Sequence, residues 1–175
     1  MKKYIVLFLL IAVAPTLFAQ NILDKFSDQD GITAVVVNKK MFELMSKVKV
    51  DASDKEMQQY MTLIKKLDHL KVFTTTNSKA ASDMKATADK YIKTVGLEEL
   101  MKVNENGKNI RIVVKSGASD SQIKELLMFI EGSGRDNETV LMSLTGNFGL
   151  NEIAVLTDKM KIPGGDELKK ATKQR

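Results

Sequence analysis

The segment spanning residues 108–147 constrains the fold more than any other part of the chain. It contains dense apolar runs at residues 110–114, 126–130 and 140–144. Turn-forming residues separate these runs at 116–120 and 132–137. Residues 97–103 precede them, followed by an Asn-Gly pair that readily adopts the positive φ angles of a tight turn. This pattern predicts an antiparallel meander that feeds one core.

Residues 126–130 are open to two interpretations. Ile123, Leu126, Leu127 and Ile130 have the i, i+3, i+4, i+7 spacing of an amphipathic helix. A continuous apolar run followed by a polar turn is also typical of a strand that is buried on both faces. We favour the strand over the helix.

The preceding part of the chain predicts alternating strands and helices. Residues 32–37 are β-branched and lie between Gly31 and Asn38, and residues 70–76 are rich in Val, Phe and Thr, so both segments are expected to be strands. Helices are expected at 41–48, 53–67 and 77–96, where apolar residues recur at helical spacing. Asn38 can cap the first of these helices, and Ser53 and Glu56 have the spacing of a capping box for the second.

Residues 146–149 are expected to turn the chain into a final amphipathic helix at 150–160, which ends before Pro163. The predicted fold class is therefore α+β. It consists of a mostly antiparallel sheet of about five or six strands, including the C-terminal meander, with about four helices packed on it.

The N-terminus has the pattern of a secretory signal peptide. Lys2 and Lys3 precede an apolar stretch at 4–13, and small residues lead to a cleavage site between Ala19 and Gln20. The apolar stretch is too short for a stable membrane span. The chain has no cysteine, which excludes a lipid anchor and disulfides. We expect an exported protein, periplasmic or extracellular, without a transmembrane span in the mature chain.

The length suits one domain. We expect a signal peptide at 1–19, a leader segment at 20–30, a single α+β domain at 31–162 and a polar, basic tail at 163–175. The formal net charge is +5 with both signs interspersed, and tryptophan is absent. Nucleic-acid binding would require a concentrated basic stripe with aromatic platforms, so no nucleic-acid partner is expected.

The sequence contains no recognisable catalytic or metal-binding set. His69 is the only histidine, and without cysteine the usual ligands for zinc or haem and a thiol nucleophile are missing. His69 acting as a base with Asp68 would also need a positioned nucleophile. Glycine pairs near 132 and 164 lack the residues that complete a phosphate-binding loop. We predict no catalytic residues, no cofactor and no metal site.

Methionine pairs provide the one candidate for a metal carrier. Met41 and Met45, like Met57 and Met61, are four residues apart and would place two thioethers on one helical face. Flexible filling of a core explains the same spacing, and Leu, Ile, Phe and Val share those faces. We favour the core role over a copper(I) site.

Several segments resemble a family of small exported proteins of Bacteroidetes that carries a domain of unknown function, number 4252. The matching stretches are the signal end at 17–20, the strand and helix start at 31–35 and 40–45, and the runs at 125–130, 138–146 and 150–153. The resemblance implies a cell-envelope location and a link to envelope-stress regulation. It brings no established activity and no functional residues. Many members have a lipid-anchoring cysteine after the signal, which this chain lacks.

These observations favour a non-catalytic exported cell-envelope protein that acts as a binding or interaction module, with an unknown envelope protein or surface component as its partner. The oligomeric state is left open. Loops on a rigid scaffold commonly carry binding, so the candidate contact residues are those of the two meander loops, namely Ser116, Ser119, Asp120, Arg135, Asp136 and Asn137.

One alternative is a small hydrolase or lyase using carboxylate or Ser/Lys chemistry, which would need a pocket where charged groups of perturbed pKa converge. Another is a small-ligand or metal carrier.

Overall fold

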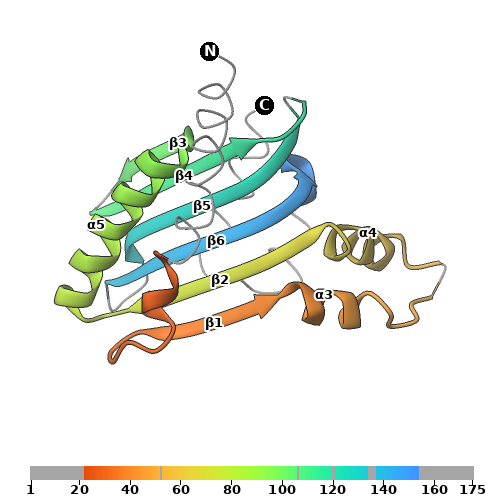
Figure 1. Cartoon of the computed structure of the whole chain (residues 1–175), viewed down its shortest axis with the longest axis horizontal. Coiled ribbons are helices and arrows are strands. Elements are labelled where there is room, and N and C mark those ends of the chain that lie inside the picture. Colours follow the sequence, from red (N-terminus) through yellow and green to blue (C-terminus); the bar gives the residue numbers. More distant parts are fainter. Residues whose placement is uncertain (1–21, 52, 106, 120, 134–136, 154–175) are drawn as a thin grey trace, which may run out of the picture.

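A computed structural model describes residues 22–51, 53–105, 107–119, 121–133 and 137–153. These residues form one antiparallel sheet of six strands in the spatial order β1-β2-β6-β5-β4-β3 (Figure 1). The strands are β1 (Thr33–Asn38), β2 (Leu67–Thr75), β3 (Glu98–Glu105), β4 (Lys108–Ser116), β5 (Gln122–Ser133) and β6 (Glu138–Gly149). The helices are α3 (Lys39–Met45), α4 (Lys55–Ile64), α5 (Ser78–Val95) and the 3₁₀ turns η1 (Asp24–Phe26) and η2 (Leu150–Glu152).

The predicted meander is confirmed, because β3, β4, β5 and β6 are neighbours in chain order. The strand interpretation of residues 126–130 is also confirmed. Leu126, Met128 and Ile130 belong to the core on one face of the sheet, whereas Leu127 and Phe129 belong to the core on the other. Burial on both faces removes the polar alternation of a half-exposed strand, which explains why the run is continuously apolar.

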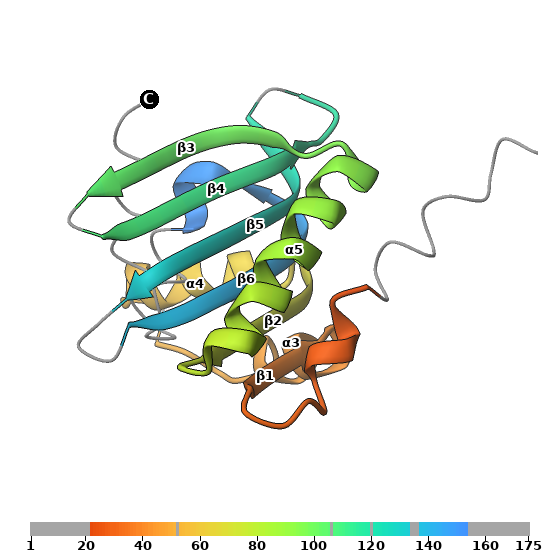
Figure 2. The same ribbon diagram turned by 90° about the vertical axis from the view of Figure 1, so that its left-hand side faces the viewer.

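The sheet separates two hydrophobic cores. Side chains of α3 and α4 pack on one face with Leu70, Ile112 and Met142. The opposite face is covered by α5 and η1, which pack against Phe73, Val113 and other apolar strand residues. Figure 2 shows α5 lying across this second face, with α3 and α4 on the far side. The sheet is therefore the middle layer of the fold.

The caps of α5 follow the sequence pattern. The Asn77 side chain accepts hydrogen bonds from the amides of Lys79 and Ala80, each at 3.0 Å, which satisfies two otherwise unpaired donors of the first turn. Gly96 ends the helix in the left-handed conformation, with φ of 71°. Both ends of the helix therefore lie where the sequence predicts them.

The other two helices show one confirmed cap and one error. Asn38 caps α3 as expected by accepting from the Met41 amide at 3.1 Å. The predicted capping box of α4 is wrong, because Asp54 accepts from the Met57 amide at 2.9 Å, while Ser53 donates to Asp51 instead. The helix consequently begins after Asp54.

Two further expectations about the elements need correction. The turn expected at 146–149 is part of β6, where the Asn147 amide donates to the Lys66 carbonyl at 2.8 Å. The described residues contain three α-helices rather than about four. The expected helix at 150–160 begins as the turn η2, and its remainder lies almost wholly outside the described residues, as does the polar tail at 163–175.

The described end of the expected leader segment packs as part of the core. Leu23 and Phe26 are 1% and 0% exposed, and the Phe26 ring lies 5.6 Å from that of Phe73. Lys25 pairs with Asp83 of α5 at 2.7 Å. The turn η1 is therefore held against α5 and β2. The signal peptide at 1–19, with Ala19 and Gln20, lies outside the described residues. Within the described ranges, no helix combines the length and apolar character needed to cross a membrane.

Candidate functional site

A row of polar side chains crosses the face of the sheet that carries α5. His69 of β2 is opposite Thr145 of β6, Thr145 is also opposite Glu125 of β5, and Glu125 is opposite Lys115 of β4. Residues paired in register across antiparallel strands point to the same face. We call these four residues, His69, Thr145, Glu125 and Lys115, the polar row.

Three irregularities in strand pairing lie directly beside the polar row. The register shifts between Leu67 and His69 in β2, between Ile123 and Glu125 in β5, and at the end of β4 after Lys115. Bulges of this kind redirect side chains and are common next to functional sites. Their coincidence at one level of three neighbouring strand pairs indicates that this end of the sheet is shaped for something other than regular packing.

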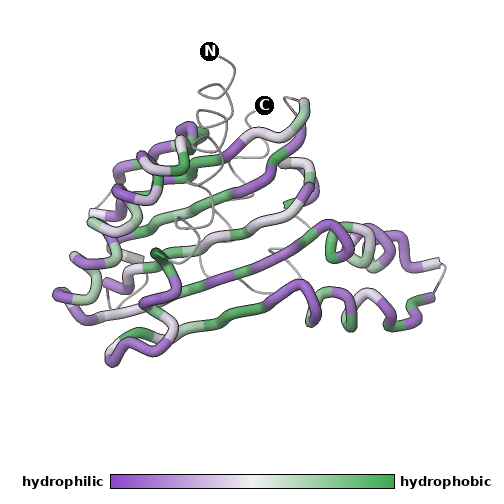
Figure 3. The backbone as a smooth tube through the Cα atoms, viewed as in Figure 1, coloured by the Kyte–Doolittle hydropathy of each residue, from purple (hydrophilic) through white to green (hydrophobic). Residues whose placement is uncertain are grey.

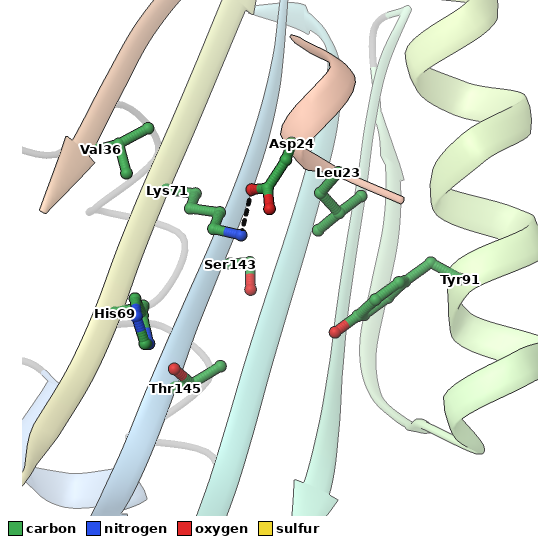
Figure 4. A pocket seen from close by; sticks show the side chains of 8 residues that line it. All are labelled: Leu23, Asp24, Val36, His69, Lys71, Tyr91, Ser143 and Thr145. Carbon is green, nitrogen blue, oxygen red and sulfur yellow. Dashed lines mark hydrogen bonds and ion pairs between the residues drawn. The ribbon is translucent and has the colours of Figure 1, made fainter. Parts of the chain in front are cut away.

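A pocket of about 300 Å³ lies on this face, between η1, α5 and the strands (Figure 4). Figure 4 shows Tyr91 reaching in from α5 with its hydroxyl toward the strands, opposite Lys71 and His69 of β2. Eight side chains line the pocket: Leu23, Asp24, Val36, His69, Lys71, Tyr91, Ser143 and Thr145.

Glu125 lies beside this pocket and is almost completely buried, at 6% exposure. Its carboxylate accepts a hydrogen bond from the Tyr91 hydroxyl at 2.6 Å and a longer one from Ser143 at 3.4 Å. Burial raises the pKa of Glu125, and these two hydrogen bonds, together with the charges of Lys115 and Lys71, offset part of that rise. Burial also raises the pKa of Tyr91, so its hydroxyl remains a donor.

Lys71 provides the positive charge of the pocket. Its side chain is 14% exposed and forms an ion pair with Asp24 of η1 (Figure 4). In the strand register Lys71 lies opposite Ser143, one position further along the same sheet face than the polar row. The ion pair therefore holds η1 at the rim of the pocket, where Lys71 and Asp24 can contact a bound molecule.

Thr145 is the least satisfied group in the pocket. Its hydroxyl oxygen is buried and has no hydrogen-bond partner among the described residues. A buried hydroxyl without a partner costs about 1–3 kcal/mol, so such groups are rare in folded proteins. At this position a bound polar molecule could supply the missing partner.

A second hollow is larger but less specific. It has a volume of about 530 Å³ and is lined by Lys55, Gln58, Gln59, Thr62, Asn151 and Glu152. All of these except Glu152 are exposed, and Glu152 pairs with Lys66 at 2.7 Å. Exposed, flexible side chains do not fix a ligand. We therefore assign the site to the pocket of about 300 Å³, although the second hollow is larger.

The candidate contact residues predicted from sequence do not form one site. Ser116 is the last residue of β4, Ser119 lies between β4 and β5, and Asn137, with φ of 53°, lies between β5 and β6. These two connections are at opposite ends of β5. Asp120, Arg135 and Asp136 lie outside the described residues. None of the described contact residues lines the pocket.

The methionine pairs have different surroundings in the structure. Among the described residues, no three His, Cys, Asp or Glu side chains are grouped to hold a metal ion. Met45, Met57 and Met61 pack against the core of the α3–α4 side, as the core interpretation predicts. Met41 is an exception, because it is 51% exposed.

Sequence reasoning missed most of the pocket. Glu125 and Ser143 are buried and Lys71 is half-buried, because the strands that carry them are covered on both faces. A polar residue at such a position is a signal that could have been noticed. That the three lie together depends on strand order and register, which no local pattern provides.

Comparison with known proteins places the chain in a family. Residues 26–156 match the family described as Domain of unknown function (DUF4252). The chain belongs to the DUF4252 family. No curated protein and no solved structure matches it. The matched part of the DUF4252 domain contains all four residues of the polar row, together with Lys71, whereas Leu23 and Asp24 of the pocket precede it.

Proposed function

We propose that this DUF4252 protein is a non-catalytic, exported cell-envelope protein of a Bacteroidetes bacterium that binds a small polar molecule in the pocket beside the polar row. The observation that carries the proposal is the buried hydroxyl of Thr145, which has no hydrogen-bond partner in the part of the chain that the structure describes and lies in a pocket that also presents Lys71 and Tyr91. The signal pattern before Gln20 and the family resemblance support the exported location. A link to envelope-stress regulation is the role that the family resemblance favours.

The chemistry of the lining favours a neutral or weakly charged ligand rich in hydroxyl or amide groups. Lys71 and Asp24 already neutralise each other, and the remaining polar groups are hydroxyls and one imidazole. Leu23 and Val36 add apolar contact. A volume of about 300 Å³ is at the lower end of the range for small-molecule sites, roughly 300–1,000 Å³.

A hydrolase or lyase is the second candidate, because Glu125 combines a raised pKa with proximity to the pocket. The geometry favours binding over catalysis. Glu125 is hydrogen-bonded to Tyr91 and Ser143, which line the pocket, whereas Glu125 itself does not line it. A general acid must reach the proton-accepting atom of the substrate directly or through one water.

The binding proposal is tested with Thr145→Val, which removes the hydroxyl and keeps the shape. A panel of sugars, amino acids and small amides is screened by thermal shift against wild type. A compound at 100 times its Kd stabilises the folded state by about 2.7 kcal/mol. Compounds that stabilise wild type should stabilise Thr145→Val less. The matched control is Thr62→Val on α4 in the second hollow, which should respond as wild type does.

Equal stabilisation of Thr145→Val and wild type by every active compound would refute the binding site. A turnover activity that is lost in Glu125→Gln and retained in Thr145→Val would favour the enzyme instead.

Export is tested separately by fractionating cells and sequencing the N-terminus of the mature protein. We expect Gln20 as the first residue in the envelope fraction, and an intact N-terminus in the cytosol would contradict export.

A further inference from the structure

Exposed apolar side chains gather on one segment of the molecule. In the described part of the chain, the large hydrophobic residues that are at least half exposed all fall between residues 35 and 48. They are Val35, Val36, Met41, Leu44 and Val48, with exposures of 51%, 50%, 51%, 52% and 60%. The first two belong to β1, the next two to α3. Figure 3 shows β1 as an apolar strand at the lower edge of the sheet.

The two edges of the sheet differ in how they are protected. At one edge, β3 carries Glu98, Glu99 and Lys102, and its pairing with β4 is interrupted by a register shift. Charged residues and bulges are the usual means of preventing an edge strand from pairing with another chain. At the other edge, β1 has no charged residue and its pairing with β2 is regular. An unprotected apolar edge is suited to accept another strand.

We propose that β1 is a homodimer interface, in which it pairs antiparallel with β1 of a second copy of the chain, so that one sheet runs through both copies. This inference goes beyond the proposed function and is independent of ligand binding. Val35 lies opposite Val72, a core residue of the α3–α4 side, so it points away from the pocket. Met41 and Leu44 on α3, which directly follows β1, are also exposed.

The charges beside β1 select the antiparallel arrangement and the second copy as occupant. Asp28 and Asp30 precede the strand, and Lys39 and Lys40 follow it, all four exposed. Within one copy Lys39 pairs with Asp68 at 2.9 Å and Lys40 with Glu43 at 3.7 Å, but exposed ion pairs of this kind contribute little and exchange readily. Antiparallel pairing brings each acidic end toward the basic end of the other copy, whereas parallel pairing would bring like charges together. The same strand is thus complementary to itself, as a two-fold symmetric interface requires.

Symmetry also limits the register. A two-fold axis perpendicular to the sheet keeps side chains on their own faces, so one residue of β1 must lie opposite its own copy. Centring the axis on Val35 sets Ala34 opposite the partner's Val36 and directs Asp30 toward the partner's Lys40. Val35 is therefore the position at which two identical side chains meet.

Single-cysteine variants test this register, because the natural chain has no cysteine. Directly opposed residues of an antiparallel pair have Cα atoms about 4.5–5.5 Å apart, which suits a disulfide. Val35→Cys should therefore form a covalent dimer rapidly under mild oxidation. In Val36→Cys the two thiols belong to residues about 8 Å apart and should cross-link slowly. Asn104→Cys, exposed on the opposite edge strand, is the control for random collision.

Sedimentation velocity gives the second readout. Wild type should sediment as a dimer, and Val35→Lys, which places two ammonium groups opposite each other, should weaken the dimer at least about tenfold. Asn104→Lys adds the same charge at the other edge and should leave it unchanged. A monomeric wild type, an undisturbed Val35→Lys dimer, or cross-linking that is fastest at residue 36 or 104 would overturn the proposal. Far-UV circular dichroism confirms that each variant is folded.

Discussion

Replacing Tyr91 by Phe removes one oxygen atom from the most buried polar contact of the site. The Tyr91 hydroxyl donates to Glu125 at 2.6 Å, and the tyrosine and glutamate residues are 2% and 6% exposed. Phenylalanine fills nearly the same volume, so the change isolates the hydrogen bond. After the change, the side-chain donor to this carboxylate that remains among the described residues is Ser143 at 3.4 Å, a long and weak bond.

The expected cost depends on pH. A hydrogen bond between neutral groups contributes about 1 kcal/mol to stability, whereas one to a charged group contributes about 1.5–3 kcal/mol. Tyr91→Phe should therefore lower the free energy of unfolding by about 1 kcal/mol at pH values below the raised pKa of Glu125, where the carboxyl is protonated, and by about 2 kcal/mol at pH values above it, where the carboxylate is charged.

The cost of Tyr91→Phe rises with pH because of the direction in which the pKa of Glu125 is shifted. Burial raises the pKa of Glu125 in the folded state. The stabilisation linked to this raised pKa is present below the unfolded pKa of about 4.3 and is lost as pH rises through the folded value. The hydrogen bond from Tyr91 lowers the pKa of Glu125, so removing it raises that pKa further and deepens the loss toward high pH.

Urea unfolding followed by far-UV circular dichroism measures these differences, since the chain has no tryptophan to report by fluorescence. The control is the same substitution in a Glu125→Gln background, where no charge can form and the two pH ranges should give equal costs. A double-mutant cycle then yields the coupling between Tyr91 and Glu125. An identical cost of Tyr91→Phe in both pH ranges in the natural background would refute the assignment of a buried, titrating carboxyl.

Other stability changes follow from packing and caps, and urea unfolding at pH 7 measures each. Gly146→Ala should cost about 3 kcal/mol, because its Cβ would lie 2.3 Å from the Lys66 carbonyl oxygen; an unchanged midpoint would show that this approach is not tight. Leu127→Ala, at a fully buried position, should cost about 3 kcal/mol through the cavity it leaves, and a cost below that of an exposed truncation would contradict the described core. Asn77→Ala should cost about 1 kcal/mol through loss of the α5 cap, and Asn77→Asp should restore most of it.

The parts of the fold that sequence reasoning predicted are those governed by local chemistry. The meander follows from apolar runs separated by turn residues, and α5 follows from the Asn77 cap and the terminating Gly96. The interpretation of 126–130 was more difficult because β5 is buried on both faces. That run satisfies the helical spacing by chance, as any continuous apolar stretch does.

The parts that could not be predicted depend on pairing between distant segments. The residues at 146–149 have turn chemistry, yet they remain in β6 because β2 lies beside them and the Lys66 carbonyl accepts from Asn147. The pairing of β2 with β6, rather than with β3, depends on tertiary contacts and not on local sequence. The pocket could not be predicted for the same reason, since it lies where β2, β6 and α5 meet.

The polar row is where the local rules of folding are broken, and this argues for function. Further along the same face, the neighbouring strands contribute Phe73, Leu141 and Phe129 to a tight core. At the polar row these strands instead carry a buried glutamate and a threonine hydroxyl without a described partner, beside three register shifts. Apolar residues would have continued the core at no such cost. The sequence specifies its fold consistently elsewhere but accepts this cost at one level of the sheet. The simplest reason for such polar residues at this level is that they bind a ligand.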